Sequence, residues 1–175
     1  MQYFCYVKVR ASKQGRIATI MTLLLFCLLL GSLTGLRSLT APAVVCWAAK
    51  LGWLDFAGTK LAFIDRPVTL IVLTVLAAIE LIADKLPKTP ARTAPPGLIA
   101  RIVLGGLCGV ALATSAGRNL LVPSIVAVVG ALIGTFVGSK TRHTLVLRAH
   151  APDLAVALAE DVIAVAGSLL IVSHI

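Results

Sequence analysis

The sequence predicts an all-α, polytopic membrane protein with about six transmembrane helices, arranged as two three-helix inverted repeats. Hydrophobic residues make up 59% of its 175 residues and charged residues only 13%, about half the charged fraction of a typical soluble domain. Its mean hydropathy is +1.01. Long apolar runs recur along the chain, and a short motif returns 81 positions after its first occurrence. The composition and hydropathy predict the class of protein, the apolar runs predict the number of helices, and the returning motif predicts the repeat.

Six apolar runs are candidate membrane spans. A span needs about 20 mostly apolar residues, because the hydrocarbon core is about 30 Å thick and a helix rises about 1.5 Å per residue. The second run is the shortest and contains Lys50, so a re-entrant segment is the alternative there. Its counterpart, the fifth, is long and uncharged, which favours spanning for both. The runs are 17–35, 39–54, 68–83, 98–116, 120–138 and 154–172.

The connections predict four parts: a basic N-terminal segment (1–20), a first repeat (21–86), a basic proline-rich linker (87–97) and a second repeat (98–175). Proline has no backbone N–H and cannot continue a helix, so the linker separates the halves. The N-terminal segment resembles the start of a signal peptide. We expect it to be retained, because the following run can span and has a counterpart in the second half. Met21 is an alternative start.

Two blocks match between the halves at the constant offset of 81. An odd number of spans in each half makes the second half enter the membrane from the opposite side, which is the inverted-repeat plan of many secondary transporters. If the second and fifth segments were re-entrant, the repeats would instead be parallel. Basic residues fall on both sides and leave the orientation open. The matched residues are Arg37, Leu39, Pro42, Val45, Ala78, Glu80, Ile82 and Ala83 with Arg118, Leu120, Pro123, Val126, Ala159, Asp161, Ile163 and Ala164.

The repeated motif predicts a helix break followed by a new helix start. Arg37 and Arg118 each follow a glycine-containing helix end and precede a residue that caps helices well. A proline, Pro42 or Pro123, comes five residues after each arginine. Free backbone N–H groups beside a guanidinium would bind an anion. The alternative is that both arginines lie at the interface and bind lipid phosphate.

Acidic residues inside the apolar runs are the other candidates. Glu80 and Asp84 are four apart and share a helix face, while Glu160 and Asp161 lie in the sixth run. A carboxylate at bilayer depth costs about 3 kcal/mol and usually faces the bundle interior. We expect Asp84 to lie nearest the interface. The candidate substrate- or ion-binding residues are Arg37, Glu80, Asp84, Arg118, Glu160 and Asp161.

These charges predict two symmetry-related clusters, in which Arg37 and Arg118 pair with Glu80 and Asp161. Such carboxylates could bind a cation or exchange protons during transport. The alternative is a pair of structural ion pairs that fix helix register.

Glycine stripes predict close helix packing. Gly130, Gly134 and Gly138 line one face of the fifth run, and Gly105 and Gly109 do so on the fourth. Small residues at this spacing let helices approach closely. They serve packing within the chain or a homodimer.

No sequence motif indicates an enzyme, a cofactor or a metal site. A nucleophile elbow, a Walker loop, an HExxH motif and a dinucleotide fingerprint are all absent from the sequence. Its four cysteines form no CxxC pair. The net charge of +9 comes from bases spread over connections, which is typical of loops that flank membrane spans. We therefore expect a lipid bilayer and no nucleic acid as the partner.

Three stretches resemble a known family. They are GLRSLTAP from Gly35 to Pro42, ELIADKLPKTP from Glu80 to Pro90, and RTAPPG from Arg92 to Gly97. Together they are similar to the small bacterial membrane proteins grouped as domain of unknown function 4126, over roughly residues 21–173. The resemblance implies an architecture and a bacterial inner membrane. It implies no activity.

Two functions follow as the leading hypotheses; a third, a lipid-modifying enzyme that uses the carboxylates, ranks last because no nucleophile or metal-ligand set accompanies them. The first is a small inverted-repeat transporter or channel for an unknown solute or ion, for which a homodimer is compatible with the small size of the chain. The second is a non-transporting membrane scaffold or assembly partner, favoured by the glycine stripes and the basic linker.

Overall fold

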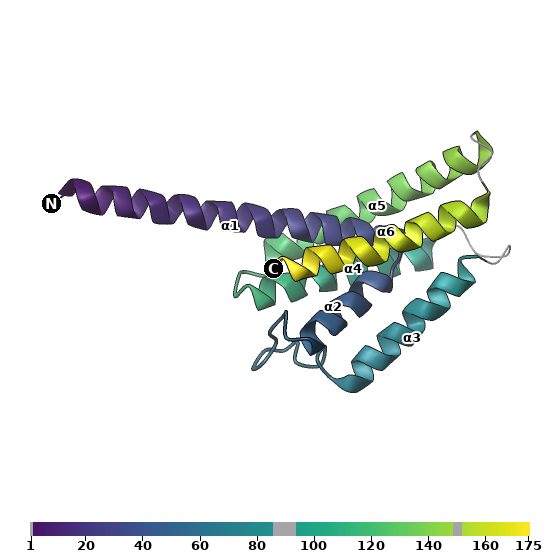
Figure 1. Cartoon of the computed structure of the whole chain (residues 1–175), viewed down its shortest axis with the longest axis horizontal. Helices are drawn as coiled ribbons and strands as arrows, with labels where there is room; N and C mark the ends of the chain where they lie inside the picture. Colours follow the sequence, from purple (N-terminus) through teal and green to yellow (C-terminus); the bar gives the residue numbers. More distant parts are fainter. Residues whose placement is uncertain (1, 86–93, 149–151) are drawn as a thin grey trace.

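The computed structural model describes residues 2–85, 94–148 and 152–175, with side chains from residue 19 onward within these ranges. The described chain is all-α, as predicted, and contains no strand. Residues 87–93 of the predicted linker lie outside it, and Pro95 to Gly97 form the first turn of a helix. The helices are α1 (Gln2–Leu36), α2 (Thr40–Lys50), α3 (Pro67–Ala83), α4 (Pro95–Ser115), α5 (Leu121–Leu147) and α6 (Asp153–Ser173) (Figure 1).

Among the described residues, four helices are long and apolar enough to cross a membrane: α1 over Thr19–Leu36, α4, α5 and α6. Helix α3 is apolar but has 17 residues. Helix α2 has 11 residues, and therefore rises about 16 Å, roughly half the hydrocarbon thickness. The sequence predicts about six transmembrane helices, and the part of the chain that the structure describes has six helices, four of which are candidate membrane spans.

A glycine ends α2 early. Gly52 has a φ of 76°, in the left-handed region that residues with a β-carbon avoid. The backbone N–H of Trp53 donates to the carbonyl of Ala48 at 2.9 Å, and that of Gly52 donates to the carbonyl of Ala49 at 3.0 Å. This hydrogen-bonding pattern closes a helix C-terminus. The predicted second run therefore continues past Lys50 as a loop.

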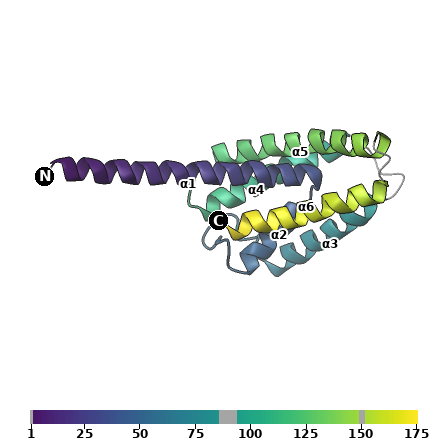
Figure 2. The ribbon, with the colours of Figure 1, turned by 45° about the horizontal axis from the view of Figure 1, so that its top comes forward.

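Successive helices run back and forth along the long axis of the molecule (Figures 1 and 2). The N-terminal part of α1 projects beyond the other helices, and the C-terminus lies at the same end of the bundle. The α4–α5 connection lies at this end too. The backbone N–H of Asp55 in the α2–α3 loop donates to Ser115 Oγ at the end of α4, at 3.3 Å. The α1–α2 connection lies towards the opposite end.

Glycines bring α1, α4 and α5 into close contact. A β-carbon on Gly31 of α1 would overlap the backbone of Ala127, and one on Gly134 of α5 would overlap the carbonyl of Ser32. A β-carbon on Gly109 of α4 would lie 2.7 Å from that of Ala127. Helices can approach this closely only where side chains are missing. The predicted glycine stripes therefore serve packing within the chain.

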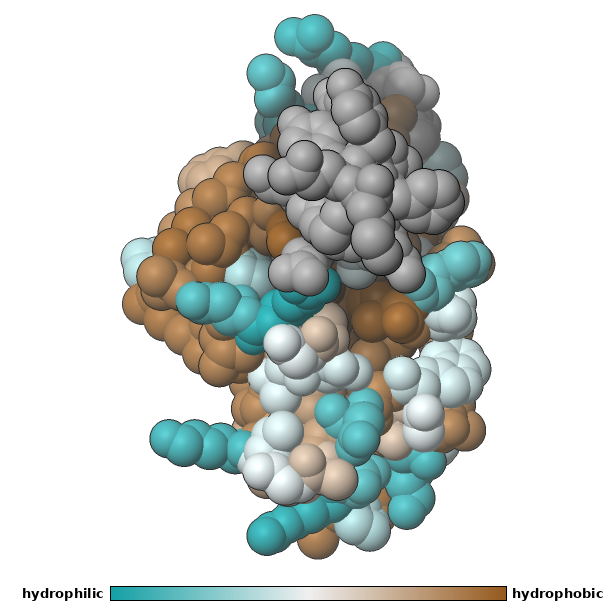
Figure 3. Space-filling model, turned by 90° about the vertical axis from the view of Figure 1, so that its left-hand side faces the viewer, coloured by the Kyte–Doolittle hydropathy of each residue, from teal (hydrophilic) through white to brown (hydrophobic). Residues whose placement is uncertain are grey.

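Large apolar side chains cover the outer surface of the bundle. The exposed apolar side chains of α3 include Val68, Ile71, Val75, Ile79 and Ile82. Viewed from the end where α1 projects, hydrophilic residues gather on the end of the molecule and hydrophobic residues lie on its flanks (Figure 3). An exposed apolar belt of this extent favours contact with lipid.

Candidate functional site

A fully buried arginine lies at the break between α1 and α2. The backbone N–H of Arg37 continues the hydrogen-bonding pattern of α1, donating to the carbonyl of Leu33 at 3.0 Å. Its side chain is 0% exposed and forms ion pairs with Asp84, directly after α3, and with Asp161 of α6. The Nη2–Oδ1 distance to Asp161 is 2.5 Å. Arg37 thus joins three separate segments of the bundle through charge.

The start of α2 is capped by a carboxylate from another helix. Glu80 Oε1 accepts hydrogen bonds from the backbone N–H of Ser38, at 2.8 Å, and from the Ser38 hydroxyl, while Oε2 accepts one from the backbone N–H of Leu39 at 2.8 Å. Backbone N–H groups at a helix N-terminus lack partners within the helix and carry partial positive charge. Glu80 therefore occupies the anion position that the helix break predicts.

We call the group formed by these residues the Arg37 cluster; it comprises Arg37, Ser38, Glu80, Asp84, Lys85 and Asp161. Lys85 Nζ lies 3.1 Å from Asp161 Oδ2. The cluster thus contains three carboxylates and two basic side chains. The expectation that Glu80 and Asp84 share a helix face agrees with their common position at the α1–α2 break. Asp84, however, pairs with a buried arginine, whereas we expected it at the interface.

Arg118 occupies a different environment from its repeat partner. Gly117, with a φ of 60°, closes α4, and the N–H of Arg118 donates to the carbonyl of Ala113 at 2.9 Å. The Arg118 side chain is partly exposed, and it forms no ion pair with the part of the chain that the structure describes. Asp161 pairs with Arg37 instead. The expectation of two symmetric clusters is therefore wrong, because the α4–α5 connection lies at the opposite end of the bundle from these carboxylates.

Pro42 and Pro123 are each the third residue of the helix that follows the break. The first turn of a helix tolerates proline, because its N–H groups have no partner within the helix. Both prolines are buried. They mark the start of α2 and of α5, as the repeated motif indicates, and they do not kink a continuous helix.

Glu160 faces a second basic residue, which sequence reasoning did not single out. Arg142 of α5 donates two hydrogen bonds to Asp153, each at 2.9 Å, and its Nη1 lies 3.7 Å from Glu160 Oε2. Neighbouring Glu160 and Asp161 thus point to different partners. Arg101 of α4 was also missed, although it is 5% exposed. Arg101 could have been singled out from the sequence, because a charged residue inside an apolar run indicates a buried or functional position.

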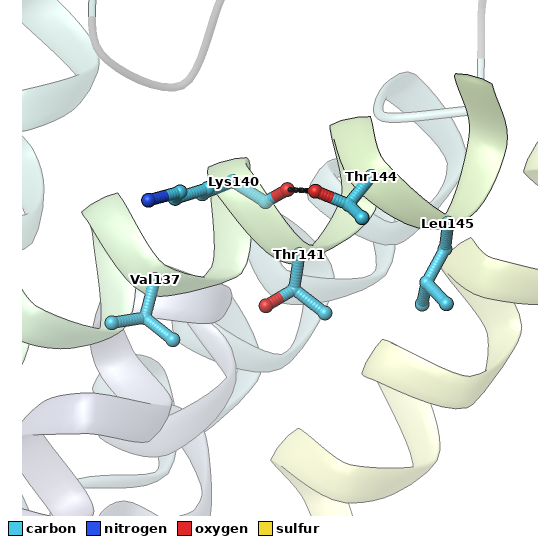
Figure 4. A pocket seen from close by; sticks show the side chains of 5 residues that line it. All are labelled: Val137, Lys140, Thr141, Thr144 and Leu145. Atoms are coloured by element: carbon cyan, nitrogen blue, oxygen red, sulfur yellow. Dashed lines mark hydrogen bonds between the residues drawn. The ribbon is translucent and has the colours of Figure 1, made fainter. Parts of the chain in front are cut away.

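A groove on the outer surface lies beside Glu160. One section, about 280 Å³, lies between α1, α5 and α6 and is lined by residues that include Leu36 and Glu160. A second section, about 320 Å³, lies farther along α5, and Figure 4 shows the side chains that line it. Val137 and Thr141 line both sections. The groove therefore reaches Leu36 and Glu160, and no residue of the Arg37 cluster lines either section.

No set of three or more histidine, cysteine, aspartate or glutamate side chains is arranged to hold a metal ion within the residues that the structure describes. Cys27, Cys46 and Cys108 are buried and form no disulfide.

Four long apolar helices, an exposed apolar belt and buried charges define a multi-pass α-helical membrane protein. The chain belongs to the family described as a domain of unknown function (DUF4126), which matches residues 24–174. This match confirms the resemblance seen in the sequence. No curated protein matches the chain, and no solved structure does.

Proposed function

We propose that the protein is a small transporter or channel for a small solute or ion, and that the Arg37 cluster is its binding site. The observation that carries this proposal is the fully buried Arg37, paired with carboxylates on two other segments at a helix break. Ionisable groups inside a membrane bundle are costly, and they usually mark a path for substrate, ions or protons. Ion pairs that only fix helix register are the competing explanation.

One feature of the surrounding structure supports this site. Helix α2 is short and starts inside the bundle, beside the carboxylates. Transporter binding sites commonly use the ends of such interrupted helices, where backbone groups are free to bind charge.

The inverted repeat is part of the proposal. It is supported by the two matching blocks in the sequence and by the positions of the α1–α2 and α4–α5 connections towards opposite ends of the bundle (Figures 1 and 2). The halves have diverged, since α2 has 11 residues and its counterpart α5 has 27. We also propose a bacterial inner-membrane location, no enzymatic activity, no cofactor and no nucleic-acid partner.

A homodimer remains part of this proposal, with an interface away from the glycine stripes, because those glycines already pack α1, α4 and α5 together. Because the glycines pack helices within the chain, the glycine stripes no longer favour a scaffold function, and only the basic linker still does. We therefore put transport first.

Flux through the purified protein in liposomes tests the function. We would compare uptake of small labelled ions and carboxylates, with and without a pH gradient, for the unaltered protein, Asp161→Asn and Asp153→Asn. Asp161 pairs with buried Arg37, whereas the side chain of Asp153, also on α6, is 57% exposed. We expect flux that Asp161→Asn reduces at least tenfold and Asp153→Asn preserves. Absence of flux from folded protein across the solute panel would count against transport.

A further inference from the structure

We propose that the groove along α1, α5 and α6 binds one anionic phospholipid, with an acyl chain in its apolar section and the phosphate at Lys140. Such a site would exist whether or not the protein transports a solute, so it goes beyond the proposed function. Three observations support it. The groove changes from apolar to polar along its length, its polar section lies at the depth of lipid headgroups, and the charge of Lys140 is open to it.

The section between α1, α5 and α6 is suited to an acyl chain. Its lining is mainly apolar and includes the exposed side chains of Ile133, Val137 and Ile163. Helix α5 packs mainly against α1 and α4 and only lightly against α6, so α5 and α6 leave this surface uncovered. Lipid tails are as apolar as these side chains, and a chain in the groove gains van der Waals contacts only. Preference for one kind of lipid must therefore come from its headgroup.

The section farther along α5 is polar. Val137 and Thr141 line both sections, and Lys140 and Thr144 line the polar one. In Figure 4, Val137, Thr141 and Leu145 project from one side of α5, and Lys140 and Thr144 lie along the adjoining edge. The hydroxyl of Thr144 donates to the carbonyl of Lys140 at 2.9 Å. The Thr141 side chain is exposed and makes no hydrogen bond within the described ranges, so its hydroxyl is open to a phosphate oxygen.

Helix α5 places this polar section at the depth of lipid headgroups. From Leu121 to Gly138 the helix carries no charged residue. This stretch rises about 27 Å, which is close to the hydrocarbon thickness of about 30 Å. Lys140 is the first charged residue after it. A lysine at this position lies in the interface, where its ammonium group meets lipid phosphates.

The surrounding charges leave Lys140 open to an anion. Its ammonium group forms no ion pair with the residues that the structure describes. The apolar section also contains the carboxylate of Glu160, which repels a phosphate when it is alone. Arg142 of α5, however, pairs with both Glu160 and Asp153 of α6. Because Arg142 compensates these two carboxylates, a phosphate in the polar section meets the positive charge of Lys140.

Lipid binding measured by native mass spectrometry tests the site. We would titrate phosphatidylglycerol, which is anionic, or phosphatidylcholine, which has no net charge, into the delipidated full-length protein in a non-ionic detergent. We expect one phosphatidylglycerol to bind saturably, at least fivefold more tightly than phosphatidylcholine. Lys140→Gln should weaken this binding at least fivefold. Arg148→Gln removes a positive charge near the same end of α5 but outside the groove lining, and it should change the affinity less than twofold.

A second pair of variants tests the acyl-chain section. Ile163→Trp puts a larger side chain into this section and should weaken phosphatidylglycerol binding at least fivefold. Its neighbour Val162 is also exposed but lines neither section, so Val162→Trp should leave binding unchanged. Glycerophosphoglycerol, the soluble headgroup without acyl chains, should not displace the lipid even in large excess. This competition separates a lipid site from a site for free phosphate esters.

The four substituted side chains are all exposed, so we expect the variants to fold, and thermal unfolding in detergent checks this. If Ile163→Trp does not fold, Ile133→Trp fills the same section from α5. Equal affinity for the two lipids, equal losses for Lys140→Gln and Arg148→Gln, or displacement by the soluble headgroup would overturn the inference. None of these measurements uses flux, so their failure leaves the proposed function standing, and absence of flux leaves the lipid site standing.

Discussion

Asp161 of α6 pairs with Arg37 at the start of the α1–α2 break, with an Nη2–Oδ1 distance of 2.5 Å. Its second oxygen lies 3.1 Å from Nζ of Lys85, just after α3. One carboxylate thus bridges two positively charged groups from different segments, and a change at Asp161 is transmitted to both. In a low-dielectric environment, removing one partner of such a group leaves an uncompensated charge.

Loss of the Arg37 charge should destabilise the protein strongly. Arg37→Gln leaves Asp84 and Asp161 without their shared cation, and removing one partner of a buried ion pair typically costs about 3–5 kcal/mol. Arg118→Gln, at the matching position of the other half, should change the free energy of unfolding by less than about 0.5 kcal/mol. Reversible unfolding in mixed detergent micelles measures both. Similar losses for the two variants would contradict the asymmetry between these sites.

The α1–α5 contact should not tolerate a methyl group. A β-carbon on Gly134 would overlap the Ser32 carbonyl, whereas one on Gly106 would meet only a side-chain methyl of Val128, at 3.3 Å. Overpacking a tight contact costs about 1–3 kcal/mol, so Gly134→Ala should lower the free energy of unfolding by this amount. Gly106→Ala should be neutral or slightly stabilising, since alanine favours helix. Equal stability of the two variants would show that the helices can separate cheaply.

Labelling of single cysteines should report the order of the helices across the membrane. In a background without native cysteines, Ala57→Cys and Asn119→Cys should react with a membrane-impermeant maleimide from one side of oriented vesicles. Arg148→Cys, after α5, should react from the other side. All three positions are exposed. The hydrogen bond from the backbone N–H of Asp55 to Ser115 Oγ holds the α2–α3 loop, which contains Ala57, beside the end of α4, which precedes Asn119. Labelling of Ala57→Cys and Asn119→Cys from opposite sides would contradict this arrangement.

The Arg142–Asp153 pair should contribute little to stability. The side chains are 19% and 57% exposed, and exposed ion pairs are usually worth about 0–1 kcal/mol because solvent screens them. A double-mutant cycle of Arg142→Gln and Asp153→Asn should give a coupling energy in this range that decreases as salt is added. A coupling energy above about 2 kcal/mol, or one that does not depend on salt, would show that the pair behaves as a buried ion pair.

Sequence patterns predicted the helical class and the chain break at Arg37, because both depend on residues that are close together in the sequence. Apolar runs require helices in a membrane, and an arginine between a glycine and a capping residue indicates a break. The same reasoning put Arg118 in a matching site and missed Arg142, which pairs with Glu160. Partner choice depends on helix rotation and depth, which the spacing of residues in one helix does not specify.

The length of α2 is a second feature that the hydrophobic pattern of the sequence did not predict. Its predicted run continues to residue 54, but the left-handed backbone at Gly52 ends the helix. A single glycine in an apolar run is compatible with a helix interior as well as with a terminus, so the hydrophobic pattern alone favoured the longer segment.

By itself, the sequence determined that this protein enters a membrane as α-helices and that its chain breaks at Arg37, since hydrophobicity and local backbone preferences are short-range properties. Only the tertiary structure decided that Glu80 caps α2 and that Asp161 pairs with Arg37. The physical reason is that buried charges take whichever partners packing brings within hydrogen-bonding distance. Here α3 and α6 both pack against α2, and this packing brings Glu80 and Asp161 to the break at Arg37.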